Sequence, residues 1–90
     1  MSRMIQLDPH RITNKQDMAA YMRENLDLPD YFGGNLDALY DCLSEYTEDV
    51  VFTIDRMALR EITFSGYSYR VLRVLEDSTR ENDHIGLRFI

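Results

Sequence analysis

The chain has no lysine or arginine between residues 24 and 55, a segment that we call the acidic block. The block holds nine carboxylates, namely Glu24, Asp27, Asp30, Asp37, Asp41, Glu45, Glu48, Asp49 and Asp55. The remaining residues hold seven acids and ten bases, so the net charge of −6 divides into −9 in the block and +3 outside it. A charge concentrated in this way predicts a basic partner. It argues against direct binding of nucleic acid or of an anionic membrane, because both are polyanions.

Cysteine and long apolar runs are also scarce. Cys42 is the single cysteine and cannot form an intramolecular disulfide, which favours a reducing compartment. No run of about 18 apolar residues occurs, and the first residues lack the apolar core of a secretory signal. We therefore expect a cytoplasmic protein that does not enter a membrane.

Length and composition predict one ordinary globular domain. The 90 residues are 44% hydrophobic and 29% charged, and neither a repeat nor a low-complexity linker divides them. A chain of this size can bury a single modest core without metal or disulfide support. We expect one domain that spans residues 1–90.

Strand and helix patterns alternate along the chain. Strands are predicted at residues 4–7, 50–54 and 85–90. Helices are predicted from a cap at Thr13 or Asn14 up to Pro29, from a cap at Asn35 through Tyr46, over residues 55–61, and from Ser65 or Ser68 to Glu81. Strands joined by helices predict right-handed crossovers and a parallel sheet. The expected fold is therefore a two-layer α/β domain with a three-stranded parallel sheet and about four helices, one sheet face being covered only partly.

The helix predicted after Asn35 carries like charges on one face. Asp37, Asp41 and Glu45 stand at i, i+4 and i+8, and each such pair destabilises a helix by roughly 0.2–0.5 kcal/mol. A solvated face is the plain interpretation. Tyr31 in the preceding Gly-Gly loop favours a second one, because aromatic anchors beside unpaired carboxylates are typical of an interface for a basic partner.

The segment around these residues matches a known signature. Residues 28–43 read LPDYFGGNLDALYDCL and closely resemble the barstar family of ribonuclease inhibitors, whose signature is roughly L-P-x-Y-[YF]-G-x-N-L-D-A-L-W-D-C-L. The resemblance extends more weakly over the whole chain. It implies a three-stranded parallel sheet with packed helices, and an inhibitor that blocks the active site of a small basic ribonuclease of the barnase type.

The resemblance also implies which residues meet the partner. They are Tyr31, Asn35, Asp37, Tyr40, Asp41, Glu45, Tyr46, Asp77 and Glu81. Asp41 matches the central interface aspartate of the family, and Asp77 and Glu81 match acidic contacts on the last long helix. A 1:1 complex, a monomer when free, and no cofactor, metal or catalytic residue are implied.

Four positions depart from the best-known member of the family. Tyr40 and Tyr46 stand where that member has tryptophan, Glu45 replaces a glycine close to the enzyme, and Asp77 is one methylene shorter than the matching glutamate. The identity of the partner is therefore open. An immunity protein against the toxin nuclease of a competitor is an alternative within the same class.

Other function classes fit the sequence less well. An enzyme is disfavoured because no His, Ser or Lys accompanies the acids, and His10 and His84 lie in separate loops without an identifiable partner. A metal site is disfavoured because the block lacks the D-x-[DN]-x-[DN]-G pattern. An acyl carrier would need a serine where Cys42 stands, and it would be all-helical. We expect Cys42 to be a buried structural thiol.

Overall fold

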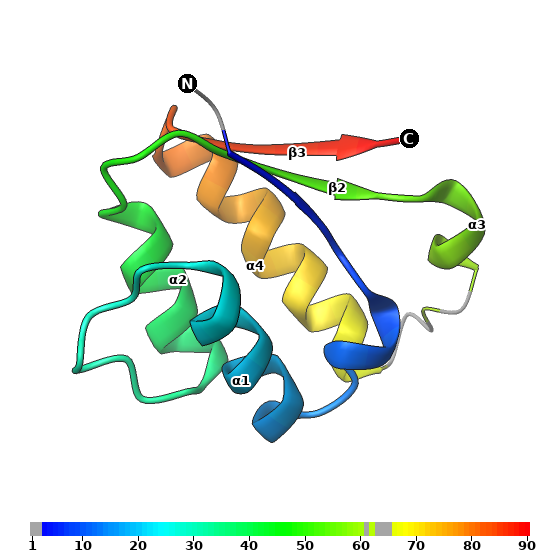
Figure 1. The fold of residues 1–90 in the computed structure, drawn as a ribbon, viewed down its shortest axis with the longest axis horizontal. Coiled ribbons are helices and arrows are strands. Elements are labelled where there is room, and N and C mark those ends of the chain that lie inside the picture. Colours follow the sequence, from blue (N-terminus) through cyan, green and yellow to red (C-terminus); the bar gives the residue numbers. More distant parts are fainter. Residues whose placement is uncertain (1–2, 61, 63–65) are drawn as a thin grey trace.

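The computed structural model describes residues 3–60, 62 and 66–90. Its elements along the chain are β1 (Arg3–Gln6), the short 3-10 helix η1 (Pro9–Arg11), α1 (Lys15–Asn25), α2 (Leu36–Ser44), β2 (Val50–Ile54), α3 (Arg56–Leu59), α4 (Tyr67–Glu81) and β3 (Ile85–Phe89). Figure 1 shows α1, α2 and α4 on one side of the sheet, with α3 beyond the end of β2. The predicted α/β architecture is confirmed.

The three strands form one parallel sheet in the order β1-β2-β3. Ile5, Phe52 and Leu87 are neighbours across it and face the helices, where Ile5 and Phe52 are buried. Met4 lies on the opposite face and is 64% exposed. The expected difference between a covered and a partly covered face is therefore confirmed at β1.

The core lies between the covered face of the sheet and the helices. Each main helix contributes an apolar stripe, because residues three and four apart share a helix face. Fully enclosed side chains include Met18 and Met22 of α1, Leu39 and Leu43 of α2, and Val71 and Leu75 of α4. Helices α2 and α4 pack side by side against this core (Figure 1).

Most element boundaries agree with the sequence patterns to within one or two residues. Asn14, not Thr13, caps α1, its Oδ1 accepting a hydrogen bond from the backbone N–H of Asp17 at 2.8 Å. Helix α4 begins at Tyr67 after Gly66, and the alternative start at Ser65 lies outside the described residues.

The first helix differs more, because it ends at Asn25 and not near Pro29, while the ends of the chain differ by one residue. The first strand ends at Gln6 instead of residue 7, and β3 ends at Phe89 instead of residue 90. The short helix spans Arg56–Leu59, and the residue at which we expected it to end, Glu61, lies outside the described residues. Helix η1 was not predicted. Asp8 creates it by accepting a hydrogen bond from the His10 N–H, with Pro9 in the first helical position.

Candidate functional site

A tight loop carries the first candidate contact, Tyr31, between α1 and α2. The Phe32 N–H donates to the carbonyl of Pro29 at 3.0 Å, and the Phe32 ring is 3% exposed. Gly34 follows with a φ of 76°, in the left-handed region that favours glycine. The turn buries Phe32 and leaves Tyr31 69% exposed, so the loop has one aromatic anchored in the core and one presented to solvent.

Asn35 links this loop to α2. Its Oδ1 accepts a hydrogen bond from the Ala38 N–H at 2.7 Å, which satisfies one of the free donors at the start of the helix. Leu39, Cys42 and Leu43 then face the core, and Asp37 and Asp41 face outward. The predicted contact Asn35 therefore has a structural role of its own, although its side chain remains exposed.

The outward face of α2 presents Asp37 and Asp41. Both side chains are exposed, and neither carboxylate forms a hydrogen bond or ion pair with any residue that the structure describes. Asp37 in the first turn is favoured by the helix dipole. Asp41 lies in the middle of the helix and lacks that compensation. These two carboxylates are therefore available to bases from outside the chain.

Glu45 occupies the C-cap of α2, directly across from Tyr31. The Tyr31 hydroxyl donates to Glu45 Oε2 over 3.4 Å, a long hydrogen bond between two exposed groups. The Glu45 charge, followed by desolvation, raises the pKa of the Tyr31 hydroxyl. A surface hollow lies beside this pair, and its walls also include the acids Asp27 and Glu48. Three carboxylates, those of Asp27, Glu45 and Glu48, therefore line this hollow.

The other two candidate tyrosines are less accessible. Tyr40 is half-buried on α2. Tyr46 is 9% exposed, and its hydroxyl accepts a hydrogen bond from the Asp27 N–H at 3.1 Å. Tyr46 therefore helps to hold the loop, and any contact with a partner is limited to the small edge that lines the hollow. Its place on the apolar stripe of the helix already indicated burial.

Cys42 is buried behind the acidic face, as predicted. Desolvation, followed by the charges of Asp41 and Glu45, raises the pKa of its thiol. A thiol held in its neutral form is a poor nucleophile and a poor metal ligand. Cys42 therefore acts as a small apolar side chain beneath Asp41.

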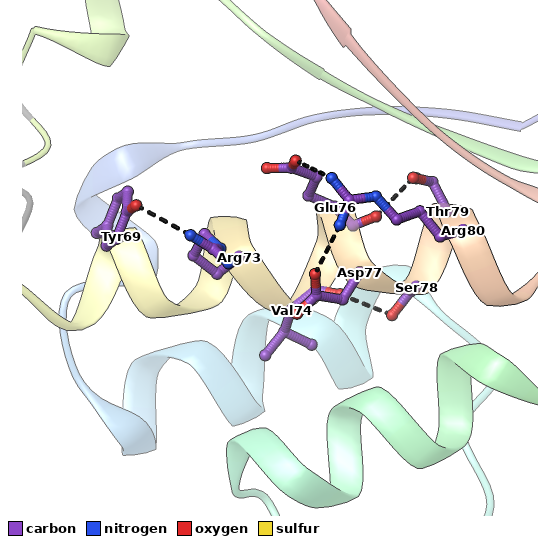
Figure 2. A network of polar contacts seen from close by, with 8 residues as sticks. All are labelled: Tyr69, Arg73, Val74, Glu76, Asp77, Ser78, Thr79 and Arg80. Carbon is purple, nitrogen blue, oxygen red and sulfur yellow. Dashed lines mark hydrogen bonds and ion pairs between the residues drawn. The ribbon is translucent and has the colours of Figure 1, made fainter.

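The last two candidates, Asp77 and Glu81, lie on α4 beside α2. Figure 2 shows the Arg80 guanidinium between two carboxylates, with Nη2 2.9 Å from Glu76 Oε1 and Nη1 3.7 Å from Asp77 Oδ1. The Asp77 charge is thus partly neutralised within its own helix. Glu81 is exposed and has no ion pair among the described residues.

Sequence reasoning missed the residue that fixes the far end of α2. Asn82 is 9% exposed, and its Nδ2 donates to the carbonyls of Leu43 and Tyr46, both at 2.8 Å. These carbonyls lie at the end of α2 and just beyond it, and the Leu43 carbonyl also accepts the backbone N–H of Tyr46 at 3.2 Å. An asparagine just past a helix suggests a local cap, but nothing in the sequence indicates that it caps another helix.

A second missed contact joins the neighbouring loops. Nδ1 of His84 lies 2.7 Å from Asp49 Oδ1, and both side chains are half-exposed. This hydrogen bond lowers the pKa of the Asp49 carboxyl. The sequence offered no partner for His84, because the two residues are brought together only by the pairing of β2 with β3.

Two further features concern possible metal sites and membrane-spanning helices in the described part of the chain. Nowhere in residues 3–60, 62 and 66–90 do three or more His, Cys, Asp or Glu side chains gather as metal ligands would. None of the helices within these residues has the length and apolarity needed to cross a membrane.

Comparison with known proteins gives the family of this chain. The family model described as "Barstar (barnase inhibitor)" matches residues 2–90. The chain therefore belongs to the barstar family, and the resemblance seen in residues 28–43 is confirmed. Among individual relatives, it is 29% identical over 80 residues to the "Putative ribonuclease inhibitor YrdF" of Bacillus subtilis (strain 168), and the match covers 88% of each chain. Family and relative together support the role of a ribonuclease inhibitor.

Proposed function

We propose that this chain binds a small basic ribonuclease in a 1:1 complex and blocks its active site with carboxylates from α2 and the preceding loop. The observation that carries the proposal is the pair Asp37 and Asp41, exposed on one helix face without a partner among the described residues. Like charges at this spacing weaken a helix. A basic partner would convert that cost into binding energy.

The chemistry of the partner explains why carboxylates serve this purpose. A ribonuclease holds the phosphates of RNA with Arg, Lys and His side chains. A carboxylate offers two acceptor oxygens to the same groups, and an arginine can bind both of them at once. Carboxylates held on a rigid helix can therefore occupy the places of substrate phosphates without being cleaved. The chain would act by occupation of the cleft and not by catalysis.

The proposed binding face extends over two helices. Tyr31, Asp37 and Asp41 are its central contacts, with Asn35 and the half-buried Tyr40 beside them. Glu45 and the edge of Tyr46 line the adjoining hollow. On α4, Glu81 would add an exposed charge, and Asp77 would have to leave or share Arg80 to contact the partner. Asp41 is central because its exposed side chain lies in the middle of α2.

Inhibition assays test the proposal directly. Several barnase-type ribonucleases are titrated with the purified chain while hydrolysis of an RNA substrate is followed. We expect activity to fall linearly to near zero at one equivalent, because tight binding to the active site leaves no free enzyme. Uninhibited RNA cleavage by all of the enzymes would overturn the proposal.

A further inference from the structure

Arg23 of α1 holds the loop that presents Tyr31. Its Nη2 donates to the backbone carbonyl of Phe32 at 2.9 Å. Its guanidinium carbon also lies 5.0 Å from the centroid of the Phe32 ring, which is a cation–π distance. One side chain thus holds both the backbone and the ring of the residue that follows Tyr31.

The same guanidinium is in reach of the other end of the loop. A Cβ added to Gly34 would lie 3.8 Å from Arg23 Nη2 and 3.2 Å from the Cβ of Ala19. Arg23 also lines two surface hollows, one beside Pro29 and Asp30 and one beside Gly34. The loop therefore passes over Arg23 between these two hollows (Figure 1 shows its path from α1 to α2).

The positive charge of Arg23 would not attract a basic partner. Within the described part of the chain no carboxylate lies within 4.0 Å of its guanidinium nitrogens, so its positive field is not cancelled by a direct ion pair. Arg23 is also the last base before the acidic block. By charge alone it would slow the approach of a basic protein, so a favourable effect on binding must act through the loop.

We propose that Arg23 is a positioning residue that keeps the loop in its binding conformation before the partner arrives, an inference that rests on the proposed function. A loop that is ordered in the free protein loses little conformational entropy on binding. Arginine suits this task better than lysine, because its planar guanidinium can donate to a carbonyl while it stacks on a ring. Tyr31 is then presented in one orientation, although Arg23 itself need not touch the partner.

The free protein gives the first test, by amide hydrogen exchange of the wild type and of the Arg23→Gln and Arg23→Lys variants. The Phe32 N–H, which is bonded to the Pro29 carbonyl, reports on the loop, and the amides of β2 report on global stability. We expect exchange at Phe32 to become about tenfold faster in both variants while β2 is unchanged. Unchanged protection at Phe32 in both variants would overturn the proposal.

Binding kinetics with a barnase-type ribonuclease give the second test. We expect both Arg23 variants to raise koff about tenfold. This is the effect of losing one charged hydrogen bond together with the contact with the Phe32 ring. Lys15→Gln is the matched control, because Lys15 is an exposed base on the same helix and lines the same hollow as Gly34. Lys15→Gln removes the same charge as Arg23→Gln, so these two variants should both raise kon slightly. The koff of Lys15→Gln, however, should stay at the wild-type value.

The two tests separate this inference from the proposed function. Equal koff in the wild type and both Arg23 variants, or an equal rise in Lys15→Gln, would overturn the role of Arg23 in binding. Failure of the wild type to bind any ribonuclease would overturn the proposed function and the binding part of this inference with it. The exchange data on the free protein still decide whether Arg23 orders the loop.

Discussion

Tyr31 and Glu45 are joined across the gap between the loop and the end of α2 by a hydrogen bond of 3.4 Å. Glu45 stands at the C-cap, where its negative charge meets the negative end of the helix dipole. The Tyr31 hydroxyl gives this unfavourably placed carboxylate a donor. In return, the carboxylate makes the phenol harder to ionise, because a second negative charge would form beside the first.

Replacing Glu45 by glutamine should lower the pKa of Tyr31 toward its ordinary value. The Glu45 charge is the largest cause that raises this pKa, and the amide removes the charge while it keeps the size of the side chain. NMR titration of tyrosine ring carbons at alkaline pH measures the change. Glu48→Gln is the control, since Glu48 lines the same hollow but is not among the causes of the shift. An unchanged Tyr31 pKa in Glu45→Gln would contradict the pairing.

Replacing Asp41 by alanine should weaken ribonuclease binding by at least about 2 kcal/mol, or roughly 30-fold in Kd. The reason is that bases of the partner would be left desolvated without their carboxylate. Glu48→Ala removes an equal charge from the same block and should cost less than about 0.5 kcal/mol. Calorimetry or surface plasmon resonance gives both values, with circular dichroism to verify the fold. Equal losses in the two variants would mean that total charge, not a placed carboxylate, binds the partner.

Association with the ribonuclease should slow as salt is added. Under the proposed function, the acidic block would steer a basic partner through its field, and the range of that field shrinks to about 10 Å at 0.1 M ionic strength. Stopped-flow measurement of kon between about 0.02 and 0.5 M NaCl should show a steady fall, with a smaller change in koff. An association rate that is indifferent to salt would exclude steering by the block.

The Asp49–His84 contact should stabilise the fold at neutral pH and lose its effect in acid. The hydrogen bond lowers the pKa of Asp49 in the folded state below its unfolded value of about 3.9, so its stabilisation is complete above that value. It disappears as the pH falls through the folded pKa. Urea unfolding at pH 2 to 7 should therefore show Asp49→Asn less stable than the wild type near neutrality and equal to it in strong acid.

The adjacent residue supplies the control for this experiment. Glu48→Gln removes the same charge from an exposed side chain without a hydrogen-bond partner among the described residues. The difference in stability between Glu48→Gln and the wild type should not show the pH dependence expected for Asp49→Asn. A gap between the wild type and Asp49→Asn that stays constant from pH 7 to pH 2 would show that His84 does not act on this carboxyl.

Replacing Asn82 by alanine should lower the free energy of unfolding by about 1–3 kcal/mol. The change would remove the side-chain donor from the Tyr46 carbonyl and leave the Leu43 carbonyl with backbone donors alone, and an unsatisfied buried group costs about 1–3 kcal/mol. Chemical denaturation measures the loss. Asp83→Ala, at the exposed next position, should stay within about 0.5 kcal/mol of the wild type. A loss in Asn82→Ala no greater than in this control would mean that the two bonds contribute nothing.

The order of elements was predictable because it depends on local patterns. The β-branched run of residues 50–54 and the capping residues Asn14 and Asn35 fall where the structure has them. Helix boundaries near Gly66 were harder to place, because the cap there has no side chain to signal it. The parallel sheet followed from the alternation of strands and helices, which leaves few other topologies.

The candidate site was predictable only in part. Exposed charges such as Asp37 and Asp41 are visible in the sequence, because nothing nearby can neutralise them. The contacts that place them are long-range: Arg23 reaches Phe32, and Asn82 reaches the end of α2. Such contacts depend on how the helices pack, and they produce no periodic pattern in the sequence. Tyr46 shows the same limit, since its burial was visible but its hydrogen bond to the loop was not.

Both ends of α2 are held by side chains that do not titrate. The Asn35 carbonyl oxygen caps the start of the helix, and the Asn82 amide holds its end. By contrast, the caps of η1 and α3 are the carboxylates of Asp8 and Asp55. The helix that carries Asp37 and Asp41 therefore keeps its orientation over the whole pH range in which the domain is folded. A change of inhibition with pH would then report on the charge state of the two interacting surfaces, since the scaffold beneath them stays constant.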